Sequence, residues 1–243
     1  MERLMKCGKI TPVFSSAVED SPMGLGMEKL DRDAFDPERV YDKVAALGVK
    51  WIRLQSGWQK TEKAEGIYDF AWLDRQVDSL LERGLKPWLC LCYGNPLYDA
   101  LAKQYQGAVG CPPIRTETAY CAWLQYVEKT VEHFTGRVGY YEIWNEPNIT
   151  SFNKFLDKCQ GDVYTEVCRI AKEEIDRIDP GSILGGPSIT GISVRSTSAT
   201  AGKPYFDDCM QEGMWKYVDA CVLHPYTHIS AEDADMIEDM KYY

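Results

Sequence analysis

The chain has 243 residues, a formal net charge of −10 and an isoelectric point of about 4.9. This acidity argues against a nucleic acid or an anionic membrane as partner, because no excess of cationic side chains is available to neutralise phosphates. Hydrophobic residues at 45% and charged residues at 26% are ordinary for a globular protein, and the length suits one large α/β domain or two small ones.

Neither a membrane span nor a secretory leader is expected. No stretch approaches the ~18 consecutive apolar residues of a membrane helix, and the segment 1–20 has no apolar region of leader length. The nine cysteines are scattered, odd in number and without a Cys-x-x-Cys pair. We therefore expect reduced, mostly buried thiols in a cytoplasmic protein, rather than disulfides or a zinc site.

Strand and helix patterns alternate along the chain. A short strand is expected around Met23–Met27, followed by a helix capped by Asp36 and stopped by Gly48. The apolar positions of that helix are Val40, Val44 and Leu47. A second helix, 69–84, has Asp69 as its cap, and its apolar stripe consists of Leu73, Val77, Leu80 and Leu81.

The same alternation continues to the end of the sequence. The other expected elements are strands at 49–55, 86–93, 138–144, 182–189 and 217–226, helices at 117–134, 163–178 and 206–216, and a helix that begins in 230–243, with Ser230 as its cap. Strands that alternate with helices of this size predict βαβ units and a parallel sheet. Six strands are counted in all.

Parallel sheets of this kind are either open and doubly wound or closed into a barrel. No glycine-rich nucleotide fingerprint follows an early strand. Polar and aromatic residues instead stand where strands end, namely Arg53, Gln55, Tyr93, Asn95, Asn145, Glu146, His224 and Tyr226. Barrel active sites are built at that edge, so we predict an α/β fold of the (β/α)8 TIM-barrel type, as a single catalytic-type domain over residues 1–243.

Strand side chains alternate between two faces. This periodicity places on common faces Trp51, Arg53 and Gln55, then Glu142, Trp144 and Glu146, and finally Val222, His224 and Tyr226. A structural pair with Glu142 is the alternative to a functional role for Arg53. For Glu146, the alternative is a solvated loop carboxylate.

The segment WNEPN at 144–148, preceded by YYEI, resembles the fourth-strand signature of the clan A glycoside hydrolases. Four segments in this order resemble glycoside hydrolase family 39 in particular: WIRLQSGW from Trp51, EGIYDFAWLD from Glu65, EIWNEPN from Glu142 and VLHPY from Val222. The resemblance spans residues 24–228. It implies retaining hydrolysis of O-glycosyl bonds in an oligosaccharide or glycoside, without a cofactor.

The resemblance also implies roles for individual residues. Glu146 matches the general acid/base, and Asn145 matches the residue that hydrogen-bonds the sugar 2-hydroxyl. Arg53 matches the arginine that orients the nucleophile, while His224 and Tyr226 match the pair that lines the cleavage subsite. Trp58 and Tyr93 are candidates to stack on sugar rings, with core packing as the alternative.

Retaining cleavage needs a second carboxylate ~5–5.5 Å from the acid, and in the family this is a glutamate at the end of the seventh strand. The helix stops at Gly48 and Gly84 lie 36 residues apart, so eight such units would need roughly 290 residues. Four late carboxylates fall in a helical pattern: Glu232, Asp233, Glu238 and Asp239. Only Glu28 remains as a candidate elsewhere, so we expect a barrel truncated after its sixth strand, with the acid/base and without the nucleophile.

Three explanations stay open. The chain is the product of a truncated gene or another fragment of a longer enzyme, a non-catalytic carbohydrate-binding pseudoenzyme, or a half-barrel completed by another polypeptide. Open edges on the first and sixth strands predict self-association. No metal is expected, since His133 lies in a helix and the pair His224 and His228 has no carboxylate or cysteine at ligand spacing.

Overall fold

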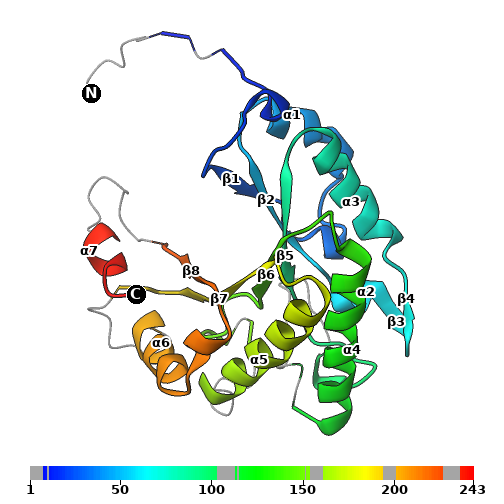
Figure 1. Cartoon of the computed structure of the whole chain (residues 1–243), viewed down its shortest axis with the longest axis vertical. Helices are drawn as coiled ribbons and strands as arrows, with labels where there is room; N and C mark the ends of the chain where they lie inside the picture. Colours follow the sequence, from blue (N-terminus) through cyan, green and yellow to red (C-terminus); the bar gives the residue numbers. More distant parts are fainter. Residues whose placement is uncertain are drawn as a thin grey trace.

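The structure is a computed structural model that describes residues 8–9, 11–102, 113, 115–150, 152–153, 161–193, 201–226 and 236–243 (Figure 1). Six parallel strands pair in the order β1-β2-β5-β6-β7-β8 and curve into a half-barrel, with helices along its outer side (Figure 1). The strands are β1 (Gly24–Gly26), β2 (Trp51–Gln55), β5 (Lys86–Leu91), β6 (Tyr140–Ile143), β7 (Ile183–Thr190) and β8 (Ala220–His224). The predicted six-stranded α/β architecture is confirmed.

Helices alternate with the strands of this sheet, and the last helix follows β8. They are α1 (Tyr41–Ala45), α2 (Trp58–Thr61), α3 (Ala71–Glu82), α4 (Glu117–Phe134), α5 (Gly161–Ile178), α6 (Gly202–Gln211) and α7 (Met236–Met240). The 3₁₀ turns are Ser15–Ala17, Leu30–Arg32, Pro37–Arg39, Ala100–Ala102 and Met214–Lys216. A small antiparallel pair, β3 (Glu62–Ala64) and β4 (Ile67–Tyr68), was not anticipated.

Helix α4 has the predicted bounds, and Thr116 caps it by accepting a hydrogen bond from Ala119 N. The first predicted helix is shorter than expected. Asp36 does accept from Glu38 N, but a 3₁₀ turn precedes α1, which ends at Ala45. The prediction that Leu47 is buried is wrong, because Leu47 lies past the end of the helix and is 65% exposed.

Two other helix predictions also need correction. Leu81 is exposed, because the stripe of α3 that faces the sheet is centred on Leu73, Val77 and Leu80. The helix predicted at 206–216 is two elements, since Gly213 at φ 83° ends the α6 segment before a separate 3₁₀ turn. The predicted Ser230 cap lies outside the described residues.

The main core lies between the sheet and its helices. On β2, Ile52 and Leu54 are buried toward the helix side, whereas Arg53 and Gln55 face the inside of the half-barrel. Four of the six described cysteines are buried: Cys90, Cys92, Cys168 and Cys209. No helix in the described part of the chain is long and apolar enough to cross a membrane. The single domain over 1–243 stays a prediction.

Trp58 and Tyr93 are fully buried, so neither is free to stack on a sugar. The Trp58 ring packs against Tyr98, Trp123 and Tyr126, and its indole N–H donates to Glu62 Oε2 at 2.6 Å. The core alternative is therefore the correct one for both residues.

Trp58→Ala is expected to lower the free energy of unfolding by about 3–5 kcal/mol, because it leaves a large cavity and an unpaired Glu62 oxygen. Trp215→Ala is the matched control: Trp215 is 59% exposed, and surface changes cost within about 0.5 kcal/mol. Chemical denaturation of both variants measures the difference. A stable Trp58→Ala protein that loses sugar binding would restore the stacking role.

Candidate active site

A cavity of about 980 Å³ opens at the carboxyl ends of the strands. Its polar lining residues are Glu28, Lys29, Arg32, Arg53, Gln55, Asn145, Glu146, Thr190, His224 and Tyr226. Parallel strands bring their carboxyl ends to one edge of a sheet, which is why residues so far apart in sequence meet there. The cavity thus contains all five residues that the sequence predicted for the site.

The turn after β6 directs Glu146. The strand ends at Ile143, and both Trp144 (φ 63°) and Glu146 (φ 48°) adopt left-handed backbone conformations. The strand alternation assumed from Glu142 to Glu146 is therefore wrong beyond Ile143. Such conformations are costly for residues other than glycine and persist where the surroundings impose them.

Strand β7 holds this turn in place. Glu146 N donates to Ser188 O at 2.9 Å. Asn148 and Thr190 exchange two hydrogen bonds, Nδ2 to the Thr190 carbonyl at 2.9 Å and Thr190 N to Oδ1 at 3.1 Å. The Thr190 hydroxyl also donates to the His224 carbonyl at 3.5 Å. The end of β7 therefore connects the Glu146 turn to His224 on the neighbouring strand.

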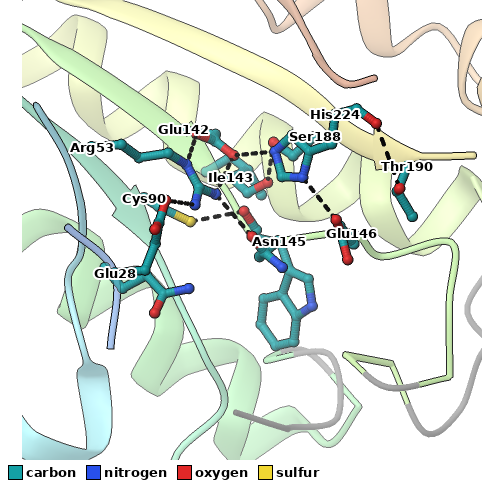
Figure 2. Close-up of polar contacts among 12 residues, drawn as sticks. Glu28, Arg53, Cys90, Glu142, Ile143, Asn145, Glu146, Ser188, Thr190 and His224 are labelled. Carbon is teal, nitrogen blue, oxygen red and sulfur yellow. Dashed lines mark hydrogen bonds and ion pairs between the residues drawn. The ribbon is translucent and has the colours of Figure 1, made fainter. Parts of the chain in front are cut away.

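Glu146 faces the cavity and meets His224, whose Nδ1 lies 3.1 Å from Glu146 Oε1 (Figure 2). The prediction that Glu146 lies within reach of Arg53, His224 or Tyr226 is confirmed for His224. Tyr226 lines the same cavity but is 76% exposed, and within the described residues no hydrogen bond joins it to Glu146. The structure thus brings together one of the two predicted sixth-strand residues with the acid/base candidate.

Arg53 forms the centre of the site (Figure 2). Its Nε and Nη2 each donate to a Glu142 oxygen at 2.7 Å, while Nη1 lies 3.1 Å from Glu28 Oε1 and Nη2 donates to Asn145 Oδ1 at 3.1 Å. Burial opposes the guanidinium charge, but Cys90 and the carboxylates of Glu142 and Glu28 outweigh it, so the pKa of Arg53 is raised. The structural pair with Glu142 is present.

The sequence reasoning missed Arg32 and Phe152, which line the cavity. Arg32 donates to Gln55 Oε1 at 2.7 Å, and Gln55 donates to the Tyr93 hydroxyl at 2.8 Å. Phe152 stacks on Tyr93 with ring centroids 6.3 Å apart and lines the cavity. The segment that carries Arg32 follows β1, and this position after a strand end is the feature of the sequence that could have predicted Arg32 as a cavity residue.

Asp31, next to Arg32, is buried. Its carboxylate lies 3.7 Å from Arg32 Nη1, too far for a hydrogen bond. Burial raises the pKa of Asp31, and the positive charges of Arg32 and Lys60 offset only part of that effect. Ionised Asp31 is therefore a cost to the folded state.

The described residues contain no group of three or more His, Cys, Asp or Glu side chains that could hold a metal ion. His133 lies in α4 and contacts Asp74, and His228 lies outside the described residues. That no metal or cofactor is needed stays a prediction.

Comparison with known proteins identifies the family. The model of the glycosyl hydrolases family 39 matches residues 33–240. The chain belongs to glycosyl hydrolase family 39. This family-39 chain is 28% identical over 139 residues to a β-xylosidase of Geobacillus stearothermophilus (51% of this chain, 25% of that protein). It is also 28% identical over 163 residues to a β-xylosidase of Caldicellulosiruptor saccharolyticus (58% of this chain, 31% of that protein).

Solved family-39 structures show the same fold. A family-39 β-xylosidase from Caulobacter crescentus aligns with a TM-score of 0.63 at 21% identity, covering 97% of this chain and 51% of that one. The family-39 enzyme of Xanthomonas axonopodis pv. citri aligns with a TM-score of 0.65 at 18% identity, covering 96% of this chain and 48% of that one. The chain thus spans about half of these solved relatives, and its six strands match part of a TIM barrel.

Asp31→Asn is expected to stabilise the family-39 chain more at about pH 7 than at about pH 4. Because the pKa of Asp31 is raised in the folded state, the protein is most stable when this carboxyl is protonated, at a pH below the carboxyl pKa of the unfolded chain. That contribution to stability is lost as the pH rises through the pKa of Asp31 in the folded protein. Urea midpoints of both proteins at the two pH values measure this. Asp33→Asn, at an exposed carboxylate, is the control, and an equal change at both pH values would contradict the prediction.

Proposed function

We propose that this chain carries the acid/base half of a retaining glycoside hydrolase site, with Glu146 as the general acid/base. The observation that carries the proposal is the position of Glu146: the strained turn after β6 directs it into the cavity, 3.1 Å from His224. An acid that protonates a leaving glycosidic oxygen must be held in this way, partly screened from water and next to the space for the substrate.

The neighbouring residues fit substrate-binding roles. Asn145 uses its Oδ1 to accept from Arg53, so its amide nitrogen is left to donate to a sugar 2-hydroxyl. Arg53 and His224 face the space where the reacting ring would lie, and Tyr226 lines its outer part. These roles rest on the family resemblance and on the geometry of the cavity together.

Retaining hydrolysis also needs a carboxylate nucleophile. Among the described residues, Glu28 is the one other carboxylate that lines the cavity with Glu146, and it is paired with Arg53. Glu238 and Asp239 lie in α7, while Glu232 and Asp233 lie outside the described residues. We therefore propose that these 243 residues do not themselves supply the nucleophile.

Aryl β-xylosides are the first substrates to test, because the two curated relatives are named β-xylosidases. The second candidate is a non-catalytic carbohydrate-binding protein, which would bind an oligosaccharide without releasing sugar. The proposed lack of a nucleophile favours this second candidate, since a site with an acid and without a nucleophile can bind a sugar but cannot hydrolyse it by the retaining route. A cytoplasmic location also stays a proposal.

Azide tests the acid/base proposal in the chain as it stands. We expect little turnover of 2,4-dinitrophenyl β-xyloside alone. Added azide attacks the anomeric carbon opposite the departing aryloxide, so a xylosyl azide of inverted configuration should form. Glu146→Gln should lower the azide-dependent rate about 10²–10⁴-fold on phenyl β-xyloside and much less on the dinitrophenyl substrate, whose leaving oxygen needs no proton.

Product analysis by NMR and the two rates decide the outcome. Equal, small losses on both substrates would remove Glu146 from the acid/base role. Strong turnover without azide would show that a nucleophile is present, and Glu28→Gln would be the first variant to make. Oligosaccharide binding without an azide effect would favour the carbohydrate-binding alternative.

We also propose that the chain self-associates through its open half-barrel. Strands β1 and β8 are the edges of the described sheet, and between them lies a largely apolar trough of about 560 Å³. Its apolar lining includes Leu25, Trp51, Trp88, Tyr140 and Val222. Unpaired strand edges beside an apolar surface favour association with another chain.

Sizing chromatography should therefore show dimers or larger species that grow with concentration. Leu25→Lys places a charge on the β1 edge and should shift the protein toward the monomer. Ile67→Lys is the control, because Ile67 is also an exposed aliphatic residue but lies on the separate β3–β4 pair. A monomeric wild-type protein at all concentrations would contradict the proposal.

A further inference from the structure

Glu142 is a buried carboxylate to which the acid/base role assigns no function. It lies on β6, is fully buried, and receives two hydrogen bonds from Arg53. Burying a carboxylate in a protein interior is costly unless a partner and hydrogen bonds compensate. The bidentate guanidinium supplies that compensation, so Glu142 is retained as a charged group inside the half-barrel.

His224 connects Glu142 to Glu146. Its Nε2 lies 3.9 Å from Glu142 Oε1, and its Nδ1 lies 3.1 Å from Glu146 Oε1 (Figure 2). The side chain is only 16% exposed, and the hydrogen bond from Thr190 to its carbonyl holds its backbone. One imidazole ring therefore lies between a buried carboxylate and the proposed acid.

We propose that Glu142 is a positioning residue that selects the tautomer of His224. A neutral imidazole has one N–H donor and one acceptor nitrogen, and the surroundings decide which is which. The distance of 3.9 Å exceeds a direct hydrogen bond, so Glu142 acts through its charge, which favours an N–H on Nε2. Nδ1 is then left as an acceptor, directed at Glu146.

This arrangement matters for the proposed reaction and rests on the acid/base role of Glu146. In the absence of substrate, the protonated carboxyl of Glu146 donates its O–H to Nδ1 of His224. The acidic proton is thereby ordered on a carboxyl group that faces the cavity where the glycosidic oxygen would lie. With the opposite tautomer, Nδ1–H would donate to a Glu146 oxygen, which favours the carboxylate form over the protonated acid.

The alternative is that Glu142 serves only to compensate the charge of Arg53. Both roles predict that Glu142→Gln destabilises the protein, since the amide has a single oxygen to accept from Arg53. Only the positioning role predicts a change at His224. The readout must therefore be the imidazole itself rather than stability or activity.

Side-chain ¹⁵N NMR of the full chain provides that readout. The chain has three histidines, and a His224→Gln variant assigns the signal. In Glu146→Gln, where a neutral amide stands in for the protonated carboxyl, we expect the neutral imidazole of His224 to have a protonated Nε2 and an unprotonated Nδ1. Adding Glu142→Gln to this variant should convert His224 to a mixture of tautomers, while His133 on the surface serves as internal reference.

Glu62→Gln is the matched control. Glu62 is also fully buried and accepts hydrogen bonds from Trp58 and Gly66, so it tests general disturbance and should leave His224 unchanged. An Nδ1–H tautomer in Glu146→Gln, or an unchanged tautomer when Glu142→Gln is added to it and the protein folds, would overturn the proposal.

If Glu142→Gln does not fold, Glu146→Gln decides. It keeps Glu142 and replaces the ionisable acid by a neutral amide, so Nε2–H at His224 in this variant supports the positioning role, whereas Nδ1–H overturns it. The result is independent of turnover. An Nε2–H tautomer together with no leaving-group effect of Glu146→Gln would remove the acid/base role alone.

Discussion

The bidentate pair between Arg53 and Glu142 is the interaction on which the site depends. It joins β2 to β6 across β5 inside the half-barrel, and its remaining contacts reach Glu28, Asn145 and His224. Removing one partner of such a buried pair typically costs about 3–5 kcal/mol, because the other charge is left without compensation. The ion pair therefore fixes Asn145 and the Glu142 side of His224, while β7 holds the turn that carries Glu146.

The two faces of the sheet differ in composition and in burial. On the outer face, aliphatic residues such as Ile52, Leu54 and Leu89 are fully covered by helices and supply the hydrophobic stability. On the inner face, Trp51 and Tyr140 remain partly exposed, and charged residues gather near the carboxyl ends of the strands. The two faces therefore differ in burial, with the outer face packed under helices and the inner face open along the apolar trough.

Much of the fold was predictable because its signals are local. The bounds of α4 follow from a cap at Thr116 and a continuous apolar stripe, and the parallel strands follow from short apolar runs between helices. The predictions failed where neighbouring turns or distant contacts intervene. A 3₁₀ turn before α1 left Leu47 outside the helix, and the left-handed conformation at Trp144 ended the alternation that had been extended to Glu146.

By itself, the sequence determined the alternating α/β architecture, the six strands and the segment at 144–148 that places an asparagine and a glutamate at a strand end. These depend on periodicity and on short motifs, which involve residues close together in the chain. Only the tertiary structure decided that Trp58 and Tyr93 are core residues, that Tyr226 is largely exposed at the cavity, and that His224 lies between Glu142 and Glu146. Those outcomes depend on contacts between segments that are distant in the chain, such as β2, β6, β7 and β8. A periodic sequence pattern does not indicate such contacts.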